Sequence, residues 1–460
     1  MKVQSLFAYV AVSAASALLL AGSASAQWSS GTKVSNVIEG SGFPAGVSAA
    51  RCGNGVVVGF GDTEANTPGN DVGFAVSKDG GSTFSDRGVL ADPSLRFGGG
   101  DSPVIGCANA NTFYYATLGF SSDPAIGCAV DCAEVAVSIS TNGGSSWQPP
   151  VVASWVTLDI YDIVQPSLAI DPTNPMRLYS AYINHNNPAP LDFPDCDSAD
   201  EYILEIVSSA DGGKTWNKRA NPAQRGNPNT QPDHTCNGFG RDPQHTGTLQ
   251  TPMVVVSPGG KVYVAYEFVA TSVNGVIGSN EIRFTRSLDG GATFSPPISV
   301  SKDAINNALP QLAVDRTGLR SRGEIYLTWS GVPTGTSTDV LVSDSVNFGL
   351  SFSFPRPVRA TSQGTQINPV LAVDNDGQVA SCYYVTGTNT PTNSSTYFYN
   401  CLTSFNHAAT WAGYQKLVSS TAPGFDALTS DFLLNSDGFF TAFELTSSGQ
   451  RHVVAETADH

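Results

Sequence analysis

The sequence has few charged residues, and the positive ones are the scarcer. Charged residues make up 13% of the 460, with 23 Lys and Arg against 39 Asp and Glu, which gives a net charge of −16. This deficit of positive charge argues against nucleic acid, anionic lipid or any polyanion held by bulk charge. An anionic ligand in a locally basic pocket stays possible.

The sequence also lacks the patterns of metal sites and membrane spans. It holds no CxxC pair and no Cys/His spacing typical of zinc, and only six histidines. We therefore expect no metal and no cofactor. Beyond residue 26 no run is apolar enough to cross a bilayer, so we expect no membrane insertion.

The first 26 residues have the pattern of a secretory signal. Lys2 provides the positive start, Leu18-Leu19-Leu20 lie in an apolar run, and Ala24-Ser25-Ala26 is a small-residue cleavage site. No cysteine follows the apolar run, so a lipid anchor is not expected. We predict cleavage after Ala26 and a secreted or periplasmic, monomeric protein formed by residues 27–460.

Glycine and proline are plentiful, with 46 Gly and 28 Pro beside 41% hydrophobic and 10% aromatic residues. This composition is typical of a turn-rich β protein with a large core. Eight cysteines in an exported chain predict disulfides.

One eight-residue motif, Ser-x-Asp/Asn-x-Gly-x-Ser/Thr-Phe/Trp, recurs along the chain. The Asp or Asn side chain can bind backbone N–H groups of its own turn, glycine accepts positive φ, and the aromatic can anchor the hairpin. A recurrence of this kind indicates a repeat architecture. The copies occupy residues 77–84, 140–147, 209–216, 287–294, 345–352 and 404–411, and the last two are degenerate, the last without its glycine pair.

This motif resembles the Asp box, or BNR repeat, of the sialidase-like β-propellers. A second repeat lies between the boxes, an apolar run, a turn and another apolar run. It occurs seven times against six boxes, beginning near Gly46, Ser102, Gln165, Thr251, Leu309, Asn368 and Thr429. We predict an all-β, seven-bladed propeller of four-stranded blades, in which an N-terminal strand around 32–37 pairs with 451–456 and completes the last blade.

The repeat register predicts disulfide partners. Cys52 and Cys107 fall at equivalent places in inner strands of neighbouring blades, and Cys382 and Cys401 fall on adjacent strands of one blade. Two further pairs are expected within loops, namely Cys128 with Cys132 and Cys196 with Cys236.

Candidate functional residues gather on the face opposite the boxes, which we call the top face. Two long connections of blade three, 184–200 and 217–250, hold half of the histidines. Long loops on a rigid scaffold often carry function, although such residues can also be solvated loop or channel-mouth residues. The candidate catalytic residues are Asp101, Tyr161, His234, Arg241, His245 and Glu267, and the candidate substrate-binding residues are Arg96, Gln165, His185, Gln250 and Asn368.

The resemblance to sialidases does not extend to their catalytic set. The resemblance would imply an arginine triad, a Tyr/Glu nucleophile pair and an Asp acid/base. The first arginine of the triad lies in an Arg-Ile-Pro segment in that family, and this chain has no such segment. Thr251-Pro252 stands where the family has Glu-Pro, and the segment 265–267 lacks the expected arginine. We therefore expect the scaffold without sialidase activity.

Three functions stay open from the sequence. The first is a carbohydrate-active enzyme with its cleft on the top face, either a hydrolase using two carboxylates or a lyase using a His or Tyr base. The second is a non-catalytic propeller that binds glycan or protein. The third is a structural surface or assembly factor.

Overall fold

The computed structural model describes most of the chain between residues 27 and 459. The described residues are 27–28, 31–35, 46–62, 71–90, 96–97, 103–121, 132–157, 161–186, 200–217, 232–237, 246–273, 276–277, 279–305, 308–316, 324–333, 337–359, 364–388, 395–420, 438–447 and 450–459. They contain strands and turns and no helix.

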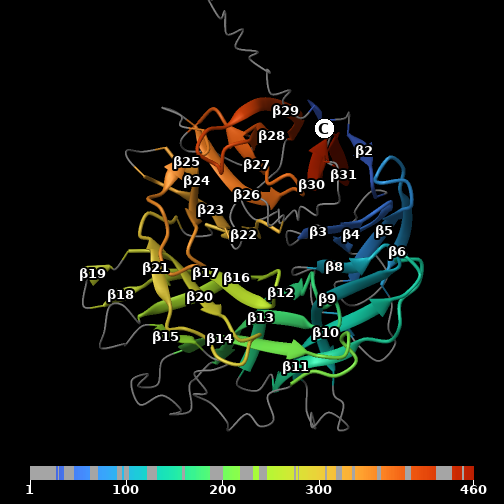
Figure 1. The fold of residues 1–460 in the computed structure, drawn as a ribbon, viewed down its shortest axis with the longest axis horizontal. Coiled ribbons are helices and arrows are strands. Elements are labelled where there is room, and N and C mark those ends of the chain that lie inside the picture. Colours follow the sequence, from blue (N-terminus) through green and yellow to red (C-terminus); the bar gives the residue numbers. More distant parts are fainter. Residues whose placement is uncertain are drawn as a thin grey trace, which may run out of the picture.

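Seven antiparallel sheets stand around one axis, as Figure 1 shows, and form a seven-bladed β-propeller. The predicted fold class is therefore confirmed. The first three blades are β3 (Val47–Cys52), β4 (Gly55–Asp62), β5 (Asp71–Ser77) and β6 (Ser85–Val89); β7 (Arg96–Phe97), β8 (Val104–Asn109), β9 (Thr112–Ser121), β10 (Cys132–Ser140) and β11 (Val151–Thr157); and β12 (Tyr161–Ile170), β13 (Leu178–Asn186), β14 (Asp200–Ser209) and β15 (Asp233–Asn237).

Blades four to six repeat the same order of strands, and a short extra hairpin interrupts blade four. The strands are β16 (Gly247–Ser257), β17 (Lys261–Ala270), β20 (Glu281–Ser287) and β21 (Ile298–Ser301), with the hairpin β18 (Ser272–Val273) and β19 (Val276–Ile277); β22 (Gln311–Val314), β23 (Ile325–Gly331), β24 (Asp339–Ser345) and β25 (Arg356–Pro357); and β26 (Thr365–Val373), β27 (Val379–Thr386), β28 (Tyr397–Ser404) and β29 (Ala412–Ser420).

The seventh blade contains strands from both ends of the described chain. β30 (Gly438–Ser447) pairs with β31 (Gln450–Asp459), and the other edge of β31 pairs with β1 (Gln27–Trp28) and β2 (Thr32–Lys33). The register places Thr32 opposite Ala455 and Lys33 opposite Val454. These backbone ladders cover an edge of β31 that would otherwise be open to further pairing.

The core is divided among the spaces between blades. Seven hydrophobic clusters each join side chains of two adjacent blades, one cluster for each space around the ring. Between blades three and four, for example, Leu204 packs with Leu249 and Tyr266. Because each strand alternates its side chains between two faces, every blade contributes to two of these clusters.

All six boxes form the same turn, at the end of the propeller opposite to where the inner strands begin. In each, Oδ1 of the Asp or Asn accepts the backbone N–H four residues on, at 2.9–3.0 Å. The degenerate copies keep positive φ without glycine, at Phe348 in one and at His407 and Ala408 in the other. The side-chain hydrogen bonds therefore hold the turn even where its favoured residue is missing.

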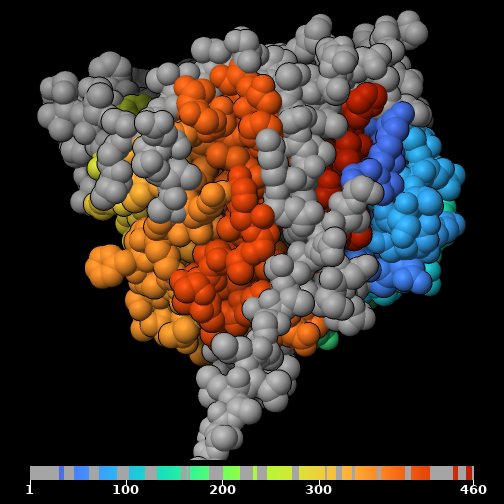
Figure 2. Space-filling model, turned by 90° about the horizontal axis from the view of Figure 1, so that it is seen from above, coloured from blue at the N-terminus to red at the C-terminus, as the bar shows by residue number. Residues whose placement is uncertain are grey.

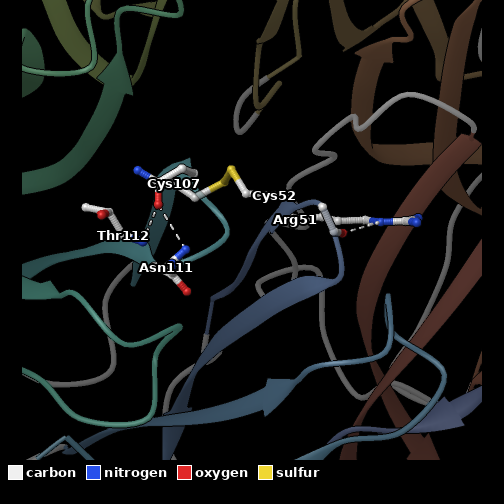
Figure 3. Close-up of a disulfide and its surroundings, with 7 residues drawn as sticks. Arg51, Cys52, Cys107, Asn111 and Thr112 are labelled. Carbon is white, nitrogen blue, oxygen red and sulfur yellow. Dashed lines mark hydrogen bonds between the residues drawn. A yellow bond between two sulfur atoms is a disulfide. The ribbon is translucent and has the colours of Figure 1, made fainter.

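Two disulfides are formed as the repeat register predicts. Cys52 and Cys107 join the inner strands of blades one and two with Cα atoms 6.3 Å apart (Figure 3). Cys382 and Cys401 are direct cross-strand partners in blade six with Cα atoms 4.1 Å apart. Cys132 is also disulfide-bonded. The other predicted partners lie outside the described residues (Cys128, Cys196) or have only their backbone described (Cys236).

Candidate functional site

Three inner strands carry an irregularity near their beginning, at the top face. The ladders shift between Val164 and Ser167 in β12, between Gln250 and Met253 in β16, and between Ile367 and Val370 in β26. A proline lies within each shifted segment, because proline has no N–H to give to the ladder and is confined to bulges inside a sheet. The predicted substrate-binding residues Gln165, Gln250 and Asn368 occupy these three bulges.

Three residues at this level have a strained backbone. Thr251, Leu309 and Asn368 have φ of 48°, 50° and 54°, and each precedes a proline. The left-handed region is costly for such residues, and a following proline favours extended backbone instead. Each outlier costs about 1–3 kcal/mol, and strain of this kind clusters at ligand sites. Its recurrence in blades four, five and six therefore marks the top end of the axis.

The side chains at the bulges are mostly uncharged and polar. Gln250 donates from Nε2 to the hydroxyl of Thr248 at 3.2 Å, and Asn368 is buried. The side chain of Gln165 lies outside the description. Amide groups offer both donors and acceptors, as neutral hydroxyl-rich ligands require.

Below the bulges the axis contains a cavity of about 150 Å³. The inner strands of blades two to six line it with apolar side chains such as Ile105, Leu168, Val255, Leu312 and Val373. Pockets for organic ligands measure about 300–1,000 Å³, so this cavity is too small for an oligomeric ligand. A large ligand at this axis has to lie over its end.

A half-exposed group of three side chains lies at the top end of blade three. His185 near the end of β13 stacks on Tyr202 of β14, with ring centroids 4.4 Å apart and planes 12° apart. Its Nε2 lies 3.8 Å from Oδ2 of Asp200. Burial, and then the charge of Asp200, raises the pKa of Tyr202. The group combines a histidine, a carboxylate and a phenol, which are side-chain types that act as general acids and bases.

The strand register separates three of the candidates that the sequence grouped together. His185 lies opposite Tyr202, whereas His234 lies opposite the next residue, Ile203, so the two histidines are on opposite faces of blade three. Tyr202 packs into the cluster shared with blade four, which places His185 on that side and His234 on the side of blade two. Glu267 is fully buried between blades four and five, where Oε2 accepts the N–H of Ala308 at 2.9 Å.

The other candidates are described in part or not at all. Asp101, Arg241 and His245 lie outside the described residues. For Arg96 and Tyr161 only the backbone is described, with Arg96 opposite Phe120 and Tyr161 opposite Asn186. Their roles stay predictions. No group of three or more His, Cys, Asp or Glu side chains within the described part of the chain is placed to hold a metal ion.

A buried charged network between blades three and four was not foreseen from the sequence. Oδ2 of Asp233 accepts hydrogen bonds from Tyr266 at 2.7 Å and from Nη1 of Arg283 at 3.0 Å. Arg283 also donates to Glu281 at 3.1 Å and lies 3.8 Å from the ring centre of Phe268. Burial first, and then the charge of Asp233, holds the pKa of Tyr266 well above its usual value. The available signal was the charged Arg283 between the apolar Ile282 and Phe284, in a charge-poor chain.

Comparisons with known proteins reveal the scaffold. No protein-family model and no curated protein sequence matches the chain. Among solved structures, an α-L-arabinofuranosidase of Fusarium graminearum matches with a TM-score of 0.50 and 12% identity over 94% of this chain and 98% of that chain. The Hadza microbial sialidase Hz136 matches with a TM-score of 0.47 and 14% identity, over 85% and 74%. An ulvan lyase matches with a TM-score of 0.48 and 9% identity, over 78% and 76%.

At these identities the likeness is one of scaffold. The chain shares its propeller fold with the arabinofuranosidase. Among the described residues, no helix has the length and apolar character needed to cross a membrane.

Proposed function

We propose that the chain is a secreted carbohydrate-active propeller, a glycoside hydrolase or a polysaccharide lyase, that binds its glycan over the top end of the axis. The observation that carries this proposal is the strained backbone at Thr251, Leu309 and Asn368. Strain repeated at one level of adjacent blades is costly, and a ligand site at that level accounts for its retention. The arabinofuranosidase of the same fold is consistent with a carbohydrate ligand.

The chemistry of the top face suits sugar hydroxyls and proton transfer. Gln165, Gln250 and Asn368 lie at the bulges, where their amides would bind hydroxyl groups. In a lyase, His185 would act as the base with Asp200 beside it, and Arg241 would neutralise the uronate of the substrate. In a hydrolase, Asp101 and Glu267 would form the carboxylate pair, with His234 of β15 and His245 as further groups of the site.

A second candidate function is glycan binding without catalysis. It is favoured by the register, which puts His185, His234 and Glu267 into three different spaces between blades. Catalysis needs acid and base within reach of one bond, whereas binding does not. Both the enzyme and the non-catalytic binding protein would be secreted through the signal in residues 1–26. The two disulfides fit an extracellular compartment.

Incubation with a panel of polysaccharides tests the proposal and separates its versions. New reducing ends without unsaturation identify a hydrolase, unsaturated products identify a lyase, and retention on a polysaccharide column without either identifies a binding module. A protein that neither cleaves nor binds any member of the panel contradicts the proposal.

A variant pair tests the location of the site. Asn368→Gly removes the amide but keeps a residue that accepts positive φ, so it should weaken binding or activity at least about tenfold without lowering Tm. Asn375→Ala is the matched control, because Asn375 lies on the same blade at the opposite end of the axial cavity. Equal effects of the two variants would place the site elsewhere.

A further inference from the structure

An exposed arginine and an exposed tyrosine meet on the outer surface between blades five and six. Arg359 follows the outer strand of blade five, and Tyr414 lies on β29 of blade six. The guanidinium carbon of Arg359 lies 3.8 Å from the centre of the Tyr414 ring, and Tyr414 is 44% exposed. Figure 2 shows the surfaces of these two blades side by side, in orange and orange-red. The pair therefore bridges two blades while staying open to solvent.

The charge of Arg359 has no carboxylate partner among the described residues. Arg356, three residues earlier, shows the contrast, because its guanidinium binds Asp344 at 2.7 Å and the carbonyl oxygens of His407 and Ala408. Arg356 thus fixes the two blades to each other, and its charge is neutralised. Within the described part of the chain, the guanidinium of Arg359 stacks on the ring of Tyr414 and has no ion pair, so the donors of its planar fork are available to a ligand.

A second polar group, the hydroxyl of Tyr383, lies in the same neighbourhood. Tyr383 of β27 is almost fully buried, and its hydroxyl has no hydrogen-bond partner among the described residues. Burial raises the pKa of Tyr383, and Tyr414 and Arg359 both act on it electrostatically, which places all three groups in one neighbourhood. A buried hydroxyl without a partner is costly and calls for an explanation such as a ligand.

We propose that Arg359 and Tyr414 form a surface subsite for an acidic saccharide. The guanidinium would bind the carboxylate of a uronic acid in bidentate fashion, and the exposed part of the tyrosine ring would contact the C–H face of the sugar. The net charge of −16 makes general attraction of a polyanion unfavourable, so recognition has to be local. The subsite is on the outer rim and does not depend on the axial site.

Calorimetric titration tests the subsite with two probes of equal length, a galacturonic acid hexasaccharide and a neutral galactose hexasaccharide. Wild-type protein should bind the acidic probe and bind the neutral one at least about tenfold more weakly. Arg359→Gln, Arg359→Lys and Tyr414→Ala should each lose about tenfold or more in affinity, since lysine keeps the charge without the planar fork.

Arg87→Gln is the matched control, because Arg87 is an exposed arginine on the outer strand of blade one. Equal losses in Arg87→Gln and Arg359→Gln would show diffuse charge attraction and overturn the proposal. Inorganic sulfate binding as tightly as the acidic hexasaccharide would also overturn it, because the site would then be a general anion site. Cleavage or retention of the polysaccharide panel, which tests the axial site, is measured in a separate experiment. A negative result there would therefore not affect the interpretation of the titrations of the Arg359–Tyr414 subsite.

Discussion

The hydroxyl of Tyr266 donates a 2.7 Å hydrogen bond to Oδ2 of Asp233, and this bond links blade four to the outer strand of blade three. Asp233 and Arg283 are both buried, so their ion pair is shielded from water. Burying two charges is costly, and removing one partner leaves the other uncompensated. The linkage thus fixes the strand that carries His234.

Asp233→Ala should destabilise the fold by about 3 kcal/mol, the lower end for a broken buried pair, because Arg283 keeps Glu281 as a partner. Thermal and chemical unfolding measure this. Lys302→Met is the control, since Lys302 is 62% exposed and its bond to Glu281 should contribute less than about 1 kcal/mol. Equal effects of the two substitutions would contradict the importance of the buried network.

Gly349→Ala should cost more than the same change at Gly88. Both glycines have φ near +70° to +75°, so each alanine adds about 1 kcal/mol of backbone strain. At Gly349 the new Cβ would also come within 2.3 Å of the Phe284 ring of the neighbouring blade, whereas nothing lies within 4 Å at Gly88. We expect an additional cost of about 1–3 kcal/mol at Gly349. Similar unfolding free energies would show that the box turns do not pack on the adjacent blade.

Acid should weaken the fold through three boxes. Hydrogen bonds from Thr83, Thr215 and Thr293 lower the pKa of Asp79, Asp211 and Asp289 from 3.8 to about 2. A depressed carboxyl pKa adds stability that is present above the unfolded value and is lost as pH falls through the folded one. Stability should therefore fall between about pH 4 and pH 2.

The triple Asp→Asn variant at these positions should flatten that acid dependence. Asn142, Asn347 and Asn406 already form the same turn, so the variant should fold normally at neutral pH. Tm measured against pH for both proteins checks the expectation. An unchanged acid slope in the triple variant would mean that other carboxyl groups cause it.

Patterns within a few residues of sequence predicted the scaffold. The boxes and the X-Pro dipeptides act locally, since a turn or a bulge is decided by the residues that form it. The number of repeats therefore predicted seven blades. The repeat register predicted the disulfides Cys52–Cys107 and Cys382–Cys401, because it places the two cysteines of each pair on neighbouring strands. The face to which a side chain belongs is less local, because a shift of one residue in pairing reverses it.

The candidate site shows the effect of that reversal. His185 and His234 are both polar residues at the top of blade three in the sequence, yet their cross-strand partners, Tyr202 and Ile203, are adjacent and put them on opposite faces. The bond between Asp233 and Arg283 joins residues 50 positions apart in different blades. Neither relationship follows from a local pattern. Both require the register of several strands at once.

Glu456 should make the pairing of β31 with the N-terminal strands β1 and β2 sensitive to pH. It lies on β31, opposite Thr441, and a Cβ on Gly31 of the N-terminal segment would be 3.3 Å from its Oε1. The side chain is 2% exposed, and Oε2 has no hydrogen-bond partner among the described residues. Burial raises the pKa of Glu456 from 4.5 to about 7.

A raised carboxyl pKa means that the folded state keeps a proton that the unfolded state has lost. The free energy of unfolding should therefore decrease as pH rises from about 4.5 to about 7. Over this range Glu456 ionises, which places an uncompensated charge beside the N-terminal segment. Glu456→Gln should remove this loss, so that its unfolding free energy exceeds that of the wild type at pH 8 by more than at pH 5. Chemical denaturation at both pH values measures the difference. A pH-independent effect of the substitution would show that Glu456 contributes through packing alone.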